Sequence, residues 1–201
     1  MGTIAFDLDG TLIDISERDY RIYSDLLVSL GYSPIRKEEY WPLRKDVTDI
    51  HKILAMSGCD KKEDVDSFLK QRSEKMEEME YLRMDSLFED TISTLAALGE
   101  NYRLVILTRR HNVQNTISQI RELGLDKLAE PIIVEGDKKE AMKAIEKLQL
   151  FVGDTENDIV PANEIGVKSI AVTTGIRNEK RLSILNPTII INSLSTITKY
   201  I

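Results

Sequence analysis

The chain has 201 residues, a formal net charge of −7 and a single cysteine, Cys59. This length suits one domain with an insertion, and 42% hydrophobic residues supply a sizeable core, which argues against a disordered chain. The acidic balance argues against nucleic-acid binding, and no apolar segment approaches the roughly 20 residues that cross a bilayer. We therefore expect a cytoplasmic protein that binds neither nucleic acid nor membrane.

Short apolar runs alternate with amphipathic patterns along most of the chain. This alternation is typical of βαβ units, and runs rich in Ile, Val and Leu predict strands because both faces of a parallel sheet are buried. The predicted strands cover residues 3–8, 103–107, 131–134, 148–152 and 167–172, with an edge strand over 188–191. The predicted helices cover 90–98, 112–123, 138–147, 156–165 and 179–185. The sequence therefore predicts an α/β fold with a three-layer, Rossmann-like parallel sheet core.

Residues 14–85 interrupt this alternation, because no strand pattern appears there. Apolar residues recur instead at helical spacing, which predicts an all-helical cap subdomain over 14–85 and a core formed by 1–13 and 86–201. Ser16 with Asp19 is expected to start its first helix, and Gly31 to end it in a left-handed conformation. In the core, Asp137 and Glu140 form a capping-box-like pair at the start of a helix.

Polar residues follow four of the predicted strands. The first strand runs into segment Asp7–Leu12 (DLDGTL), and the second ends at Thr108. The third is followed by Lys138 and Lys139, and the fourth runs into segment Gly153–Asp158 (GDTEND). Because the carboxyl ends of parallel strands meet at one edge, where ligands usually bind, we expect all four to converge on one site.

Such a site would bring together the carboxylates of Asp7, Asp9, Asp154 and Asp158. A pair of like charges at about 4 Å costs about 4 kcal/mol at an effective dielectric of 20, so a cation is needed among them. Oxygen ligands with no histidine or cysteine nearby favour a hard divalent ion, and Mg²⁺ best tolerates few protein ligands together with phosphate oxygens. A lysine beside the ion completes a site suited to a dianionic phosphate.

Segment 7–12, Thr108, Lys138 and segment 153–158, in this order, resemble the four motifs of the haloacid dehalogenase-like superfamily. The resemblance covers essentially the whole chain, and the helical insertion after the first motif is similar to the family's mobile cap. The sequence departs from the family's commonest third motif, because Lys138-Lys139 stands where Lys-Pro is frequent. Lys138 is favoured as the acting lysine, with Lys139 as the fallback.

The resemblance implies a role for each motif. Asp7 would be the nucleophile and Asp9 the general acid and base, while Thr108 and Lys138 would stabilise the phosphoryl group. Asp7, the backbone carbonyl of Asp9 and Asp154 would reach Mg²⁺, with Asp158 helping directly or through water.

Two arginines are expected to contact the substrate in addition to Thr108 and Lys138. Arg109 directly follows Thr108 and would face the same crevice. Arg44 belongs to a basic cluster in the helical insertion and would grip the distal part of an anionic substrate, whereas most charges on such an insertion face water.

These features predict a Mg²⁺-dependent phosphatase that hydrolyses a small phosphorylated metabolite through an aspartyl-phosphate, as a monomer or homodimer. A phosphomutase of the same family, similar to a phosphoglucomutase, is the first alternative, because the aspartyl-phosphate could donate to a bound sugar phosphate. A signalling module that only accepts a phosphoryl group is the second, although such modules are shorter and lack an inserted helical subdomain.

Overall fold

The computed structural model describes residues 1–201. The chain divides into two compact units, one formed by residues 1–14 and 86–201 and the other by residues 15–85. Asp14, expected in the helical insertion, lies in the first unit. None of the helices combines the length and apolar character that a membrane span requires.

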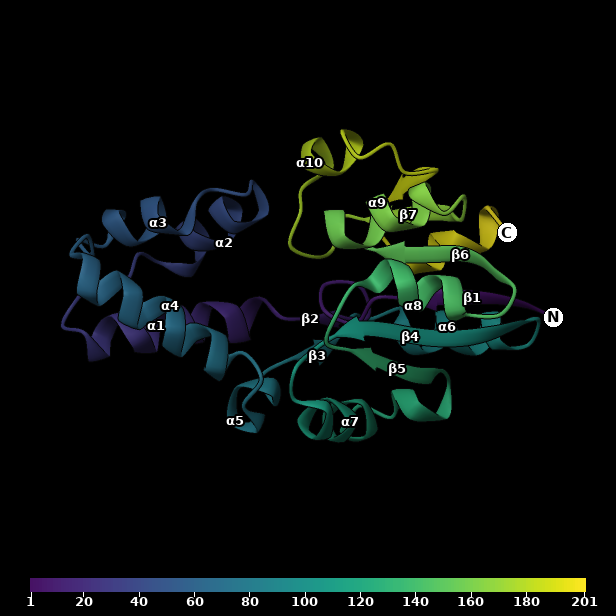
Figure 1. Cartoon of the computed structure of the whole chain (residues 1–201), viewed down its shortest axis with the longest axis horizontal. Coiled ribbons are helices and arrows are strands. Elements are labelled where there is room, and N and C mark those ends of the chain that lie inside the picture. Colours follow the sequence, from purple (N-terminus) through teal and green to yellow (C-terminus); the bar gives the residue numbers. More distant parts are fainter. The chain divides into compact units, whose positions relative to one another are not determined.

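The first unit is built on one six-stranded parallel sheet (Figure 1). Its strands are β1 (Gly2–Phe6), β4 (Tyr102–Arg109), β5 (Glu130–Val134), β6 (Leu148–Gly153), β7 (Lys168–Val172) and β8 (Ile189–Ile191). They lie in the order β5-β4-β1-β6-β7-β8, so the first strand of the chain is central. All six match predicted strands, with each end within about two residues, as expected for boundaries read from sequence. The predicted α/β class is confirmed.

Helices cover both faces of this sheet (Figure 1). They are α6 (Thr91–Gly99), α7 (Val113–Glu122), α8 (Lys138–Ala144), α9 (Glu156–Glu164) and α10 (Glu179–Ser183). On one face Ala5, Val105 and Phe151 pack with Met142 of α8 and Ala162 of α9. Their neighbours in the strands point to the opposite face and are also buried. Burial on both faces explains why these strands are continuous apolar runs.

Short elements that the sequence did not indicate complete the first unit. Strands β2 (Ile13–Asp14) and β3 (Ser86–Leu87) pair antiparallel, with Asp14 opposite Ser86. Two 3₁₀ helices, η1 (Leu125–Lys127) and η2 (Leu194–Lys199), follow α7 and β8. The chain therefore leaves the first unit and returns to it along two paired segments.

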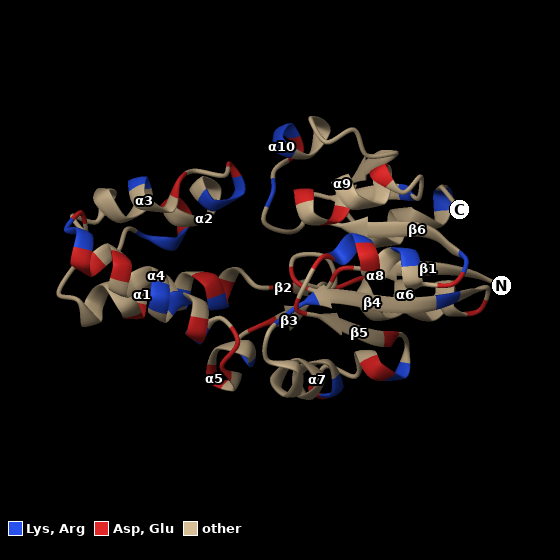
Figure 2. Ribbon diagram, viewed as in Figure 1, with Lys and Arg blue, Asp and Glu red and all other residues tan.

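The second unit is helical. It contains α1 (Ser16–Ser29), α2 (Lys37–Lys45), α3 (Ile50–Met56), α4 (Lys62–Lys75) and α5 (Met79–Leu82). Its core is aromatic: Tyr23 stacks on Tyr40 with ring centroids 4.3 Å apart and meets Phe68 edge-on. Gly31 follows the end of α1 with φ +84°, as predicted. Acidic and basic segments are interspersed along these helices (Figure 2).

Asp19 does not cap α1. No side chain caps this helix, and Asp19 points into the helical unit, where only 1% of its side chain is exposed. Its carboxylate accepts hydrogen bonds from Arg72 at 2.6 Å, Arg44 at 3.1 Å and the Tyr40 hydroxyl at 3.0 Å. The helix begins at Ser16, as predicted, but the expected role of Asp19 in starting it was wrong because distant partners bind this carboxylate.

A second buried ion pair joins the two ends of the helical unit. Arg18, near the start of α1, pairs with Asp85 at 3.1 Å, and neither side chain is exposed. Arg18 also donates to the Met76 carbonyl at 2.9 Å. The segments through which the chain enters and leaves this unit are therefore tied to each other.

Candidate active site

The site lies where β1, β4, β5 and β6 end. The Asp7 amide donates to the Val152 carbonyl at 2.8 Å, which extends the β1–β6 pairing by one residue. Gly10 then turns the chain with φ +78°, a conformation that favours glycine. A Cβ at Gly10 would also lie 2.8 Å from the Asp154 carboxylate carbon. Both the backbone conformation and the close packing of these strand ends therefore require glycine at this position.

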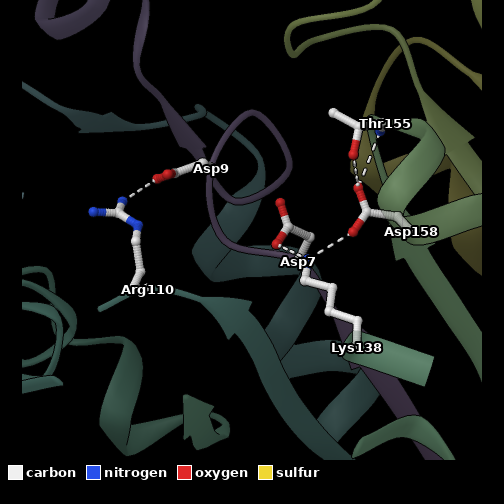
Figure 3. Close-up of polar contacts among 6 residues, drawn as sticks. All are labelled: Asp7, Asp9, Arg110, Lys138, Thr155 and Asp158. Atoms are coloured by element: carbon white, nitrogen blue, oxygen red, sulfur yellow. Dashed lines mark hydrogen bonds and ion pairs between the residues drawn. The ribbon is translucent and has the colours of Figure 1, made fainter. Parts of the chain in front are cut away.

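Lys138 lies at the centre of the site (Figure 3). Asp137 caps α8 by accepting from the Lys139 amide at 2.8 Å, which makes Lys138 the first helical residue. The Lys138 ammonium donates to Asp7 at 2.5 Å and to Asp158 at 2.7 Å, with only 7% of its side chain exposed.

Neighbouring residues of α8 turn away from the site. Lys139 pairs with Glu164 at 2.7 Å, so Lys138 is the lysine that reaches the strand ends. Glu140 pairs with Lys143 at 2.7 Å. The expected Asp137–Glu140 pair therefore supplies the cap through Asp137 alone.

Asp158 anchors this lysine from α9. One of its oxygens accepts from Lys138, and the other accepts from the Thr155 amide at 3.0 Å and the Thr155 hydroxyl at 2.6 Å (Figure 3). Thr155 and Asp158 form a capping box at the start of α9. Both oxygens of Asp158 are thus engaged with the protein.

Asp154 is fully buried, and only one of its oxygens has a partner. Its Oδ2 accepts from the Ile176 amide at 2.6 Å, whereas Oδ1 has no hydrogen-bond partner. A buried polar atom without a partner is costly in a protein interior, so Oδ1 marks a position where a ligand would be stabilised.

Asp9 points away from this cluster. Its carboxylate accepts from the buried Arg110 at 2.5 Å, and 21% of the Asp9 side chain is exposed (Figure 3). Its predicted role as acid and base would require access to a substrate oxygen, and the carboxylate is partly exposed.

Burial and neighbouring carboxylates raise the pKa of Asp7 and of Asp154. Burial raises the pKa of Asp7 to about 7; Lys138 counteracts this, and repulsion from Asp158 and Asp9 adds to it. Burial, with repulsion from Asp158 and Asp7, raises the pKa of Asp154 well above its usual value. Burial disfavours the Lys138 ammonium, but Asp158 and Asp7 outweigh it and raise its pKa. One lysine thus leaves an excess of negative charge.

The residues present fit a divalent cation. Carboxylate oxygens of Asp7, Asp154 and Asp158 lie within 4.8 Å of one another, and all three residues are buried. An all-oxygen donor set suits a hard ion. The partnerless Oδ1 of Asp154 and the excess negative charge independently favour a cation at this place.

The remaining predicted site residues lie in three places. Thr108 is buried near the end of β4, two residues beyond the partner of Phe6 in β1. Arg109 is exposed and lines, with Lys138, a hollow of about 420 Å³ in the first unit. Arg44 belongs to the helical unit, where its guanidinium binds Asp19 at 3.1 Å. Its role toward a substrate stays a prediction.

Sequence reasoning did not assign a role to several groups around the carboxylates. The capping pattern of Thr155 and Asp158 was readable in the sequence, because the two residues are three positions apart. The partnership of Arg110 with Asp9 had no local signal, because 101 residues separate them. The same holds for the Ile176 amide, which reaches Asp154 from a loop after the next strand.

The first unit is an α/β fold with a buried aspartate cluster, the candidate active site, at the carboxyl edge of its sheet. Residues 4–172 match the model of the haloacid dehalogenase-like hydrolase family, so the chain belongs to this family. This confirms the resemblance inferred from the four motifs.

Several named proteins are similar to the chain over nearly its whole length. A phosphoglycolate phosphatase from Vibrio parahaemolyticus is 27% identical, covering 98% of this chain and 95% of the relative. The pyrophosphatase PpaX from Halalkalibacterium halodurans is 26% identical, covering 96% and 94%.

Solved structures agree on the fold. A haloacid dehalogenase-like family hydrolase from Streptococcus pneumoniae has a TM-score of 0.79 at 20% identity, covering 100% of this chain and 98% of the other. A chain described as a candidate beta-phosphoglucomutase from Thermotoga maritima has a TM-score of 0.67 at 14% identity, with complete coverage of both chains at 100%.

Proposed function

We propose that the chain is a Mg²⁺-dependent phosphatase that hydrolyses a small phosphomonoester through an aspartyl-phosphate on Asp7. The observation that carries the proposal is the buried Lys138 ammonium between Asp7 at 2.5 Å and Asp158 at 2.7 Å. This arrangement supports the proposal because it holds Asp7 beside a positive charge at the edge of the sheet where ligands usually bind. The phosphatase relatives support the same class of reaction.

The proposed chemistry uses two displacements at phosphorus. The Asp7 oxygen that does not bind Lys138 forms a bond to phosphorus while the bond to the leaving oxygen breaks, and Asp9 gives that oxygen a proton. Water then forms a bond to phosphorus while the bond between phosphorus and the Asp7 oxygen breaks, and Asp9 takes a proton from the water. Phosphate is released and the Asp7 carboxylate is regenerated. Thr108 and Lys138 stabilise the phosphoryl oxygens in both steps.

Asp7, Asp154 and the backbone carbonyl of Asp9 would hold the ion. Because Thr155 and Lys138 engage both oxygens of Asp158, this residue is expected to act through water. A bound Mg²⁺ would neutralise charge and orient the phosphoryl group.

The helical unit, residues 15–85, is proposed to act as a cap over the site. Closure of such a unit excludes bulk water and adds residues that select the substrate. We propose Arg44 as one such residue. Its guanidinium would leave Asp19 and bind the distal part of an anionic substrate.

Replacement of Asp7 by Asn tests the proposal. We expect Mg²⁺-dependent phosphate release to fall by at least about three orders of magnitude, because the amide is a poor nucleophile. Asp126→Asn is the matched control, since Asp126 is exposed in η1 and far in sequence from every motif. Phosphate release that survives in Asp7→Asn at the wild-type rate would refute the nucleophile.

The substrate panel starts from the names of the relatives. Phosphoglycolate and pyrophosphate are the first compounds, followed by sugar phosphates, nucleotides and phosphoamino acids, each with and without Mg²⁺. An isomerised hexose phosphate without free phosphate would favour the mutase instead. An aspartyl-phosphate that persists for many minutes without turnover would favour the signalling module.

A further inference from the structure

The loop between β7 and α10 contacts the candidate site at three points. The Thr174 hydroxyl donates to the Gly10 carbonyl at 2.9 Å, and the Ile176 amide donates to Asp154 at 2.6 Å. Arg177 donates to both oxygens of Glu156 at 2.8 and 2.7 Å. We call residues Thr174–Arg177 the strap, because they tie the turn after β1 to the start of α9.

Gly175 brings the strap close to Asp154. A Cβ built on Gly175 would lie 2.7 Å from the Asp154 Cβ and still closer to its carboxylate. No Cβ atom tolerates such a contact with a buried group, so a side chain here must displace either the strap or Asp154. Gly175 has no positive φ, so this close approach is what requires glycine.

Arg177 ties the end of the strap to the start of α9. Its guanidinium forms the two bonds to Glu156 and also donates to the Ile176 carbonyl at 3.4 Å. Glu156 is the first residue of α9, the helix whose cap holds Asp158. A bidentate arginine–carboxylate pair restricts orientation more than a lysine pair does.

We propose that the strap positions Asp154 for cation binding, with Gly175 and Arg177 as positioning residues. The inference rests on the metal site of the proposed function. The Ile176 amide occupies Oδ2 of Asp154 and leaves Oδ1 without a partner, in a residue whose carboxylate lies within the cluster shared with Asp7. Groups that orient a ligating carboxylate typically change metal affinity by about tenfold to a hundredfold when they are removed.

Calorimetric titration of the purified, substrate-free protein with Mg²⁺ tests this inference. The variants are Arg177→Met, Arg177→Lys and Gly175→Ala. We expect Arg177→Met and Gly175→Ala to raise the Kd for Mg²⁺ about tenfold to a hundredfold. Arg177→Lys should fall between them and the wild type, because one ammonium keeps the attraction to Glu156 but not the paired geometry.

Two control variants test whether the Kd for Mg²⁺ changes merely because a positive charge is lost or because a glycine is substituted. Lys180→Met removes one exposed positive charge from α10, and Gly99→Ala adds a methyl group where the nearest atom is 3.8 Å away. Both should keep the Kd within about twofold. Loss of a positive charge near a cation site would by itself strengthen binding, so weaker binding in Arg177→Met cannot come from charge.

A folded Arg177→Met protein whose Kd for Mg²⁺ stays within twofold of the wild type overturns the inference, even if its Tm falls. Should that variant fail to fold, Gly175→Ala and Arg177→Lys decide by the same criterion. A wild type that takes up no Mg²⁺ overturns the inference together with the metal site. A wild type that binds Mg²⁺ but releases no phosphate refutes only the proposed hydrolysis. The role of the strap is then still decided by the Kd values of the variants for Mg²⁺.

Discussion

Asp19 in the helical unit offers a sharp test of how buried charge stabilises this protein. Its carboxylate binds Arg72 at 2.6 Å and Arg44 at 3.1 Å, and its side chain is 1% exposed. Asp19→Asn keeps the shape but leaves two guanidinium groups without their shared counter-charge. We expect the free energy of unfolding to fall by about 3 kcal/mol.

The magnitude follows from the geometry. At an effective dielectric of 20, Arg72 at 2.6 Å and Arg44 at 3.1 Å attract the carboxylate by about 6 and about 5 kcal/mol before dehydration is counted. Removing one partner of a buried ion pair typically lowers the free energy of unfolding by about 3–5 kcal/mol. Arg44 and Arg72 are 20% and 21% exposed, so water compensates in part and the lower end applies. The midpoint of thermal unfolding should fall by about 6–12 °C.

The pH dependence of the free energy of unfolding gives a second test of the contacts between Asp19 and its two arginines. Burial favours the neutral acid, but Arg72 and Arg44 outweigh it and hold the pKa of Asp19 well below its usual range. A depressed folded-state pKa stabilises the protein above the unfolded pKa of about 3.9, and this stability is lost as pH falls through the folded value. The difference between wild type and Asp19→Asn should be constant above about pH 5 and shrink below pH 4.

Urea and thermal unfolding, followed by circular dichroism from pH 3 to pH 8, measure both quantities. Glu39→Gln makes the same chemical change in the exposed pair with Arg36 and should leave stability unaltered. An Asp19→Asn protein as stable as the wild type at pH 7, or a difference that grows as pH falls, would refute the reasoning.

Four further predictions concern the candidate site. Lys138→Met should lower kcat about a hundredfold to a thousandfold, whereas Lys139→Met should leave it close to wild type, as steady-state phosphate release will reveal. Arg110→Met should lower kcat about tenfold to a hundredfold with little change in KM, because it frees the Asp9 carboxylate from a fixed orientation. Thr155→Val should destabilise the protein by about 1 kcal/mol in urea unfolding, since α9 loses the hydroxyl of its capping box. Removal of divalent ions by a chelator should abolish phosphate release, and added Mg²⁺ should restore it; activity that persists in chelator would contradict the metal site.

The parallel sheet was predictable because its strands are buried on both faces. In β6 the three consecutive residues Leu150, Phe151 and Val152 are all apolar and all buried, although their side chains alternate between the two faces of the sheet. Strands β2 and β3 escaped prediction because two residues are too few to show any periodicity.

The motif residues were predictable for a different reason, because polar groups directly after apolar strands mark the ligand-binding edge of a sheet. What the sequence could not provide was the set of partners. Asp19 lies at a helix start, where capping is the ordinary expectation, yet its strongest partner, Arg72, is 53 residues away. Arg177 likewise gave no sign of its pairing with Glu156, which depends on how two loops meet in space.

Because β2 and β3 pair, the chain enters and leaves the helical unit through two segments that lie side by side. Asp14 and Ser86 face each other across the pair, so excision of residues 15–85 leaves two chain ends only about 5 Å apart. A two-residue turn can bridge that gap, and the Arg18–Asp85 pair departs intact with the excised piece. A helical module of another sequence could therefore be inserted between Asp14 and Ser86 without any change in the order of the sheet strands.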